Sequence, residues 1–389
     1  MIYLDNASTT PVSRGVLNDM LPYFTEKFGN AGTLYSLGRD AKAAIEKARE
    51  QTAKLFGCNP GFVFFNSGAS EGNATVFEGI WGTLRSFGQT HIVVSETEHE
   101  SAYLAAGQLG LKGFELSTVK PNADGVVTCD AVKAVLRDNT GLVSVMYCNN
   151  ETGAVNEVKA IGELCAEREI FFHCDCTQAA GQYPLDVNEN NISFATISAH
   201  KMYGPKGVGA LYMITSLDPI IQGSSQQEDG FRGGTENVPG IVGLGSACAS
   251  AVFNMERDNE YIQNLKQQFV WELCHHMDVT SLEDAGMGIN GRHWVSTGKV
   301  LNLHISGVHG ESLVLAMDAM GVCISSGSAC SEHSDEPSRT LVSMGLTAEQ
   351  ARECVRVSFS KFNTVAEVKE AARLMAVAVK LLREGVSIP

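Results

Sequence analysis

The chain has 389 residues, 44% of them hydrophobic and 19% charged, which is typical of a globular protein that buries a large core and divides into two domains. Its formal net charge of −15 argues against direct nucleic-acid binding, because phosphate contacts need clustered lysine and arginine. We find no apolar run of the roughly 18 residues that a membrane span needs and no leader pattern, so we expect no membrane contact and a cytoplasmic location.

Helical and strand patterns alternate through the first two thirds of the chain. We expect helices at 41–56, 70–84, 99–109, 129–136 and 158–168. Short apolar runs predict strands at 62–65, 91–95, 112–117, 142–148, 169–174 and 192–198. This alternation is typical of an α/β domain in which a mostly parallel sheet is covered by helices on both faces.

The pattern changes after residue 238. A long helical stretch at 238–276 is followed by a strand at 300–305, a helix at 310–320, a strand at 353–358 and an amphipathic helix at 365–383. These elements predict a smaller α+β domain. We therefore assign a large cofactor-binding domain to 15–255 and a small domain to 1–14 and 256–389.

Asp175 and Lys201 form the most informative pair in the sequence. Asp175 follows an apolar strand, and Lys201 follows the next strand twenty-six residues later. Each residue alone has a simpler explanation, a helix cap for Asp175 and a solvated surface lysine for Lys201. Together they indicate a lysine held as a Schiff base to pyridoxal phosphate and a carboxylate on the cofactor's ring nitrogen.

Polar residues after other strands point to the same edge of the sheet. The run from Asn66 to Asn73 comes after a strand and opens a helix, so its backbone N–H groups near Ala69 and the Ser70 hydroxyl could hold a phosphate, or could serve only as a helix cap. His99 follows the next strand, either as a ring stacked on the cofactor or as a cap. Asn150 follows a further strand.

Eleven cysteines, an odd number without any Cys-x-x-Cys, argue against a disulfide framework. Cys174 and Cys176 are expected to be small buried hydrophobic residues. Cys330 differs, because it lies among small and polar residues, in a stretch from about 323 to 337 that is typical of an exposed loop. A thiol in such a loop is a candidate nucleophile.

Nine motifs, in order between residue 4 and about residue 362, resemble the class I cysteine desulfurases, the NifS- and IscS-like enzymes. They are Asp5 to Pro11, Ser67 to Glu71, Thr97 to His99, Asn149 to Gly153, Asp175 to Gln178, Ser198 to Lys201, Arg232 to Asn237, Ser325 to Cys330 and Val355 to Ser358. The resemblance implies the fold of the type I pyridoxal-phosphate transferases, with a mostly parallel seven-stranded sheet in the large domain, and a homodimer whose active sites lie at the subunit boundary.

The resemblance also implies a role for each matching residue. Lys201 would carry the cofactor, Asp175 would hold the pyridine nitrogen, and His99 would stack on the ring and move protons. The remaining contacts implied are Gln178 and Asn150 near the phenolic oxygen, Ala69, Ser70, Ser198 and His200 at the phosphate, Thr235 at the phosphate of the other subunit, and Arg356 with Asn150 at the substrate. Cys330 would take the sulfur of L-cysteine as a persulfide, release L-alanine, and pass the sulfur to an acceptor protein for iron–sulfur assembly, tRNA thiolation or DNA phosphorothioation.

Some positions depart from the family pattern, and other functions stay open. Tyr35 stands where the family often has histidine, and Ser224, Ser225 and Gln226 replace a usual triple glycine. A selenocysteine or cysteine-sulfinate lyase and an aminotransferase share this fold, and an aminotransferase would not need Cys330. A scaffold that binds partners without catalysis would show no cofactor absorbance. We predict no metal site.

Overall fold

The computed structural model describes residues 1–221, 227–291, 296–326 and 336–385. Its largest sheet has seven strands in the order β2 (Val63–Asn66), β8 (Gly209–Met213), β7 (Phe194–Ser198), β6 (Phe171–Asp175), β5 (Thr140–Ser144), β3 (His91–Ser95) and β4 (Glu115–Val119). Strand β8 pairs antiparallel with both of its neighbours, and all other pairs are parallel. The mostly parallel seven-stranded sheet is thus confirmed.

Helices cover both faces of this sheet, because successive strand residues point to opposite sides. In β3, Ile92 and Val94 pack in a cluster with α4 (Ala69–Ser86) and α5 (Glu100–Leu111). Val93 faces the other way, into a cluster with α3 (Ser36–Phe56), α6 (Cys129–Val135), α7 (Val158–Glu167) and the start of α8 (Val238–His276). Burial on both faces explains why the strands read as continuous apolar runs.

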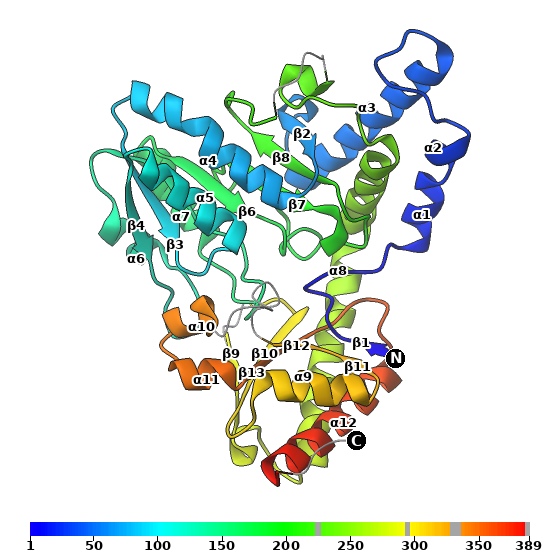
Figure 1. The fold of residues 1–389 in the computed structure, drawn as a ribbon, viewed down its shortest axis with the longest axis vertical. Helices are drawn as coiled ribbons and strands as arrows, with labels where there is room; N and C mark the ends of the chain where they lie inside the picture. The colour runs from blue at the N-terminus through cyan, green and yellow to red at the C-terminus, as the bar shows by residue number, and fades with distance from the viewer. Residues whose placement is uncertain (222–226, 292–295, 327–335, 386–389) are drawn as a thin grey trace.

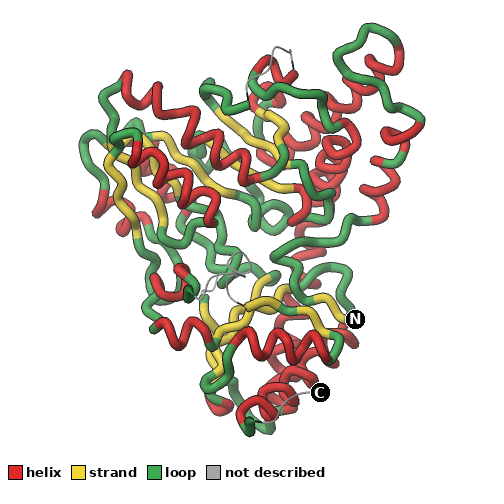
Figure 2. The backbone as a smooth tube through the Cα atoms, viewed as in Figure 1, coloured by secondary structure: helices red, strands yellow, loops and turns green. Residues whose placement is uncertain are grey.

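A second group of strands lies apart from the large sheet (Figure 2). Four antiparallel strands, β12 (Ser325–Ser326), β13 (Cys354–Ser358), β10 (Val300–Ile305) and β9 (Met287–Asn290), pack against α9 (Gly310–Ala319) and α12 (Val365–Arg383). Strand β1 (Ile2–Tyr3) pairs in parallel with β11 (Val322–Cys323), so the amino-terminal residues join this group. The short helices α1 (Arg14–Met20), α2 (Pro22–Thr25), α10 (Arg339–Ser343) and α11 (Ala348–Arg352) complete the α-helices of the described chain.

Helix α8 connects the two groups (Figure 1). Its first half packs against α3 and α1 in the core of the large sheet, and Ile262, Leu265 and Phe269 belong to the other core, beside α12. We propose that the domain boundary falls within this helix, near residue 255. Among the described helices, α8 alone is long and apolar enough to cross a membrane by composition. The prediction that no run reaches that length was therefore wrong, although packing in two cores is typical of a helix of a globular protein.

The predicted helices agree with the structure within two residues at each end, except that α3 begins at Ser36 instead of residue 41; the short helices α1, α2, α10 and α11 were not predicted, and several strands differ. The helices at 238–276 and 365–383 have the predicted bounds. The strand predicted at 142–148 ends at Ser144, because its pairing with β3 stops there, although the N–H groups of Val145 and Tyr147 still donate to the carbonyls of His173 and Asp175 in β6. The strand predicted at 112–117 lies instead at 115–119, and β8 was not predicted at all.

Candidate active site

The carboxyl ends of the central strands open onto one cavity of about 330 Å³, a volume suited to a cofactor or small substrate. The cavity brings together most of the predicted site residues, which come from both groups of strands. Its lining consists of Ala7, Ser8, Ala69, Ser70, His99, Met146, Asn150, Asp175, Thr177, Gln178, Ser198, His200, Lys201 and Arg356. Thr235 is the one predicted site residue of the described chain that is not among them.

Asp175 is the last residue of β6 and is almost fully buried. Its Oδ1 accepts a hydrogen bond from the backbone N–H of Thr177 at 2.9 Å, and its Oδ2 accepts one from Asn73 Nδ2 at 2.9 Å. Both donors are neutral, so neither of them compensates the charge of the carboxylate. The side chain is therefore held in place and still able to pair with a cationic ring nitrogen.

Asn73, which holds Asp175, is at the centre of a buried polar network that we did not predict from the sequence. Its Oδ1 accepts a hydrogen bond from Thr196 Oγ1 at 2.7 Å and lies 3.2 Å from His173 Nε2. Burial lowers the pKa of His173 to about 4, so its ring is neutral at pH 7. The only sequence signal for this role is the position of Asn73 on the face of α4 that packs on the sheet.

Lys201 lies in the short 3₁₀ turn η2 (Ala199–Lys201) that directly follows β7. Its Nζ donates hydrogen bonds to the backbone carbonyls of Ala7 and Ser8, each at 2.8 Å. The amino-terminal segment thus lies against the lysine, and it is fixed there by a hydrogen bond from the Thr10 N–H to the His200 carbonyl. We did not predict the contacts of Ala7 and Ser8, since they join residues about 190 positions apart.

The start of α4 forms a cradle for an anion. Gly68 precedes the helix with φ 151°, and the N–H of Ala69 donates to Ser198 Oγ at 2.8 Å, which fixes β7 against the helix start. The Ser70 side chain is exposed at the cavity. Burial and nearby lysines lower the pKa of His200 to about 4, so His200 would meet a phosphate as a neutral hydrogen-bonding group.

His99 has the cap role that the sequence left open for it, and its ring also faces the cavity, where stacking on a cofactor stays a prediction. It is the N-cap residue of α5, where its Nδ1 accepts a hydrogen bond from the Ser101 N–H, and its ring also lines the cavity. Burial lowers the pKa of His99, which favours a neutral imidazole able to exchange a proton. Ser101 Oγ accepts a hydrogen bond from Asn73 Nδ2 at 3.0 Å, so the networks of His99 and Asp175 meet.

Arg356 reaches the cavity from the small sheet, where it pairs in register with Ser325 of β12. Its Nη2 donates to Asp5 Oδ1 at 2.9 Å and to Ser8 Oγ at 2.7 Å, and its Nη1 donates to the Asn150 carbonyl at 3.0 Å. The residue is only 1% exposed. A buried guanidinium held from three sides presents a rigid fork, which suits recognition of a carboxylate.

Several buried polar atoms at the cavity have no hydrogen-bond partner within the described part of the chain: Thr177 Oγ1, Gln178 Oε1 and Arg356 Nε. Unpaired buried polar groups are costly, so such a cluster is typical of a site that pairs with a ligand. Pyridoxal phosphate has a ring nitrogen, an aldehyde and a phosphate. The cavity offers a matching group for each of them: the carboxylate of Asp175, the amine of Lys201 and the N–H groups at the start of α4. The residues therefore fit this cofactor.

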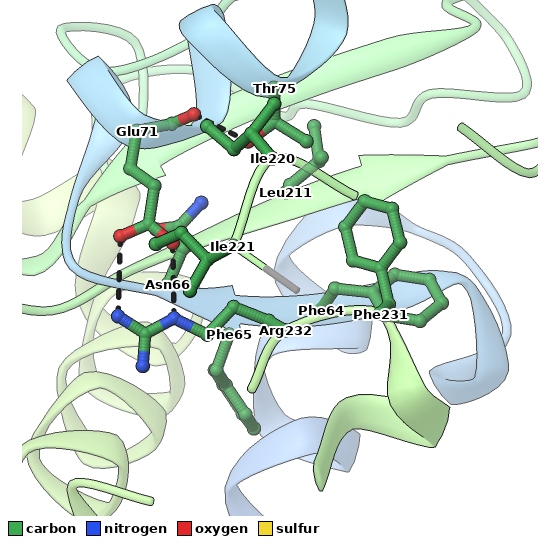
Figure 3. A pocket seen from close by; sticks show the side chains of 10 residues that line it. All are labelled: Phe64, Phe65, Asn66, Glu71, Thr75, Leu211, Ile220, Ile221, Phe231 and Arg232. Atoms are coloured by element: carbon green, nitrogen blue, oxygen red, sulfur yellow. Dashed lines mark hydrogen bonds and ion pairs between the residues drawn. The ribbon is translucent and has the colours of Figure 1, made fainter. Parts of the chain in front are cut away.

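Thr235 is exposed and lies outside the cavity of its own chain. The segment before it is fixed to α4 by an ion pair between Arg232 and Glu71 at 3.1 Å, and Figure 3 shows the two side chains facing each other beside a small apolar pocket. Cys330 and Ser224 to Gln226 lie outside the described residues. Tyr35 is exposed and does not line the cavity.

The sheet, the lysine and the acid at its carboxyl edge, and the anion cradle define the class of fold-type I pyridoxal-phosphate enzymes. The aminotransferase class-V family matches residues 2–370. A protein of Rickettsia massiliae named "Cysteine desulfurase IscS" is 39% identical, over 98% of this chain and 92% of that protein. The chain belongs to the class-V aminotransferase family and, within it, to the cysteine desulfurases.

Solved structures agree with this placement. A structure titled "NIFS-LIKE PROTEIN" superposes with a TM-score of 0.89 at 29% identity, covering 98% of this chain and 99% of the other. A second, titled "SspA in complex with cysteine", gives a TM-score of 0.80 at 31% identity over 94% of this chain and 100% of the other. The cysteine in that title belongs to the neighbouring protein.

Proposed function

We propose that this protein removes the sulfur of free L-cysteine, releases L-alanine and holds the sulfur as a persulfide on Cys330. The observation that carries the proposal is the meeting of Lys201, Asp175 and Arg356 at one cavity. An amine, a buried acid and a fixed guanidinium match the three parts of a bound amino-acid–cofactor pair. Membership of the cysteine desulfurases narrows the substrate to L-cysteine.

Each residue at the cavity has a task in this proposal. Lys201 would bind the cofactor covalently, and Asp175 would keep the cofactor's ring nitrogen protonated. Pyridoxal phosphate supplies an electron sink for the substrate's Cα when it is bound. The released Lys201 Nζ would then take the α-proton, and His99 would exchange a proton above the ring.

Arg356 would bind the α-carboxylate of the substrate through its fork of N–H groups. Nε has no partner in the described chain, and Nη2 is held by Asp5 and Ser8. A carboxylate oxygen that accepts from Nε would satisfy the N–H that has no partner in the described chain. Asn150, whose carbonyl fixes Nη1, would orient it.

Cys330 would attack the substrate sulfur as a thiolate, so that the carbon–sulfur bond breaks and a sulfur–sulfur bond forms. The persulfide sulfur would then be transferred from Cys330 to an acceptor protein.

We further propose a homodimer in which Thr235 completes the phosphate site of the other subunit; its exposed position outside its own cavity supports this role. We propose the cytoplasm as the compartment, because the ten described cysteines are all free, as is usual where thiols stay reduced.

Three pathways are candidates for the use of the sulfur: iron–sulfur assembly, tRNA thiolation and DNA phosphorothioation. Labelling with radioactive cysteine in cell extract would identify the acceptor that removes label from Cys330.

Two variants test the proposal directly. Lys201→Ala should remove the visible absorbance of the purified protein, because the cofactor can no longer be held covalently. Cys330→Ser should keep that absorbance and lose sulfur release from L-cysteine. If Cys330→Ser still produces alanine and sulfide at the parent rate, the assignment of Cys330 as the nucleophile is wrong. If it keeps amino-group transfer to a keto acid, the chain is an aminotransferase.

A further inference from the structure

Lys299 is a second lysine at the site, and neither the sequence motifs nor the proposed chemistry uses it. We propose that Lys299 is a positioning residue that fixes the backbone of Lys201 and, as a neighbouring cation, makes the Lys201 nitrogen easier to deprotonate. This inference rests on the proposed function, since it concerns the lysine that would hold the cofactor.

The geometry of Lys299 is well defined. The residue is 3% exposed, and its Nζ donates a hydrogen bond to the Lys201 backbone carbonyl at 2.8 Å. Its own carbonyl accepts from the Phe359 N–H at 2.8 Å, beside β13. The ammonium therefore joins the small sheet to the turn that carries Lys201.

The segment before Lys299 cannot move easily. The Thr297 N–H donates to the Gly153 carbonyl at 3.0 Å. A side chain at Gly298 would meet Gln263 of α8 at 2.7 Å from its Oε1 and at 3.0 Å from its Cα, so α8 packs directly on this backbone. A lysine on a fixed backbone holds a fixed position beneath Lys201.

The charged and titratable groups that act on Lys299 come from four parts of the described chain. Lys201 lies on η2, Arg356 on β13, Cys148 after β5 and Asp5 in the amino-terminal segment. Burial, followed by the charge of Lys201, lowers the pKa of Lys299 to about 7. Lys299 in turn contributes to the low pKa of His200. Asp5 is the only carboxylate in this set, and it is paired with Arg356.

Repulsion between two cations is reciprocal, so Lys299 disfavours a proton on the Lys201 nitrogen as much as Lys201 disfavours one on Lys299. The effect is greatest below pH 7, where Lys299 is charged. It serves the reaction, because Lys201 must be an unprotonated amine when it takes the α-proton. The hydrogen bond to the Lys201 carbonyl holds the turn while the side chain moves.

The test uses the purified enzyme loaded with pyridoxal phosphate and follows its visible absorbance as a function of pH. Lys299→Met removes the charge and the hydrogen bond, whereas Lys299→Gln removes the charge and keeps a donor. In both, the midpoint of the pH-dependent band should rise by about one unit. Lys266→Met is the matched control, since Lys266 is a partly buried lysine that donates to the Thr297 carbonyl at 3.2 Å, and its midpoint should equal that of the parent.

An unshifted midpoint in Lys299→Gln would overturn the inference, whether or not Lys299→Met shifts, because the charge would then have no effect. An equal shift in Lys266→Met would overturn it too. Thermal unfolding of each variant separates this readout from loss of fold, and Lys299→Gln carries the test if Lys299→Met does not fold. Failure of the proposed function looks different: without cofactor binding the parent protein would show no band to titrate, and as an aminotransferase it would show the band but release no sulfur from L-cysteine.

Discussion

Replacing Asn73 by alanine should weaken cofactor binding although Asn73 does not line the cavity. The Asn73 side chain is fully buried and takes part in four polar contacts, with Asp175, Ser101, Thr196 and His173. Alanine removes the only side-chain donor to Asp175 Oδ2 in the described chain. The carboxylate then keeps the Thr177 N–H on its other oxygen and becomes free to rotate.

The magnitude follows from the groups left without partners. A hydrogen bond to a charged group contributes about 1.5–3 kcal/mol, and a buried hydroxyl without a partner costs about 1–3 kcal/mol. We therefore expect Asn73→Ala to destabilise the apoprotein by about 2–4 kcal/mol. Loss of the hold on Asp175 should raise the Kd for pyridoxal phosphate roughly tenfold or more, since tenfold corresponds to about 1.4 kcal/mol.

Urea unfolding of the apoprotein and titration of its absorbance with pyridoxal phosphate measure the two effects separately. Asn73→Asp is the sharper variant, because it keeps the shape but replaces the donor by a second carboxylate that repels Asp175. Asn254→Ala, at a partly exposed position of α8, is the matched control, since the only side-chain hydrogen bonds of Asn254 within the described chain go to Ser250 of the same helix. Parent-like cofactor affinity in both Asn73 variants would refute the role of Asn73 in holding Asp175.

Two further predictions concern charged groups at the site. Arg356→Lys should raise the KM for L-cysteine about 10- to 100-fold while leaving the cofactor band unchanged, because lysine keeps the charge but cannot make the planar contact; a parent-like KM in steady-state kinetics would contradict the carboxylate contact. Glu98 is buried, and burial followed by Asp175 raises its pKa to about 8. The folded protein binds the Glu98 proton more tightly than the unfolded chain does, so protonation of Glu98 stabilises the fold. This contribution to the free energy of unfolding is complete below about pH 4.5 and is lost as the pH rises to about 8. Glu98→Gln should therefore remove a decline in unfolding free energy between these pH values, and identical pH profiles in parent and variant would show that Glu98 does not titrate there.

The elements that could be predicted were those with a strong local pattern. The helix at 365–383 has an apolar stripe at helical spacing and a capping box at Thr364 and Glu367, so both pattern and cap define its start. Strand β8 was missed because Gly209 and the preceding glycines read as a turn, whereas its residues are buried between β2 and β7. The end of β5 was misplaced because an apolar run does not reveal that one of its two neighbouring strands has stopped.

The sequence by itself determined the alternation of strands and helices, and with it the meeting of Asp175, Lys201, His99 and the start of α4 at one edge of the sheet. That much follows because parallel strands end on the same side. Only the tertiary structure decided the contacts of Asn73, the approach of Ala7 and Ser8 to Lys201, and the place of Lys299. These contacts depend on register and on packing between the two cores, which a single sequence does not encode as a local pattern.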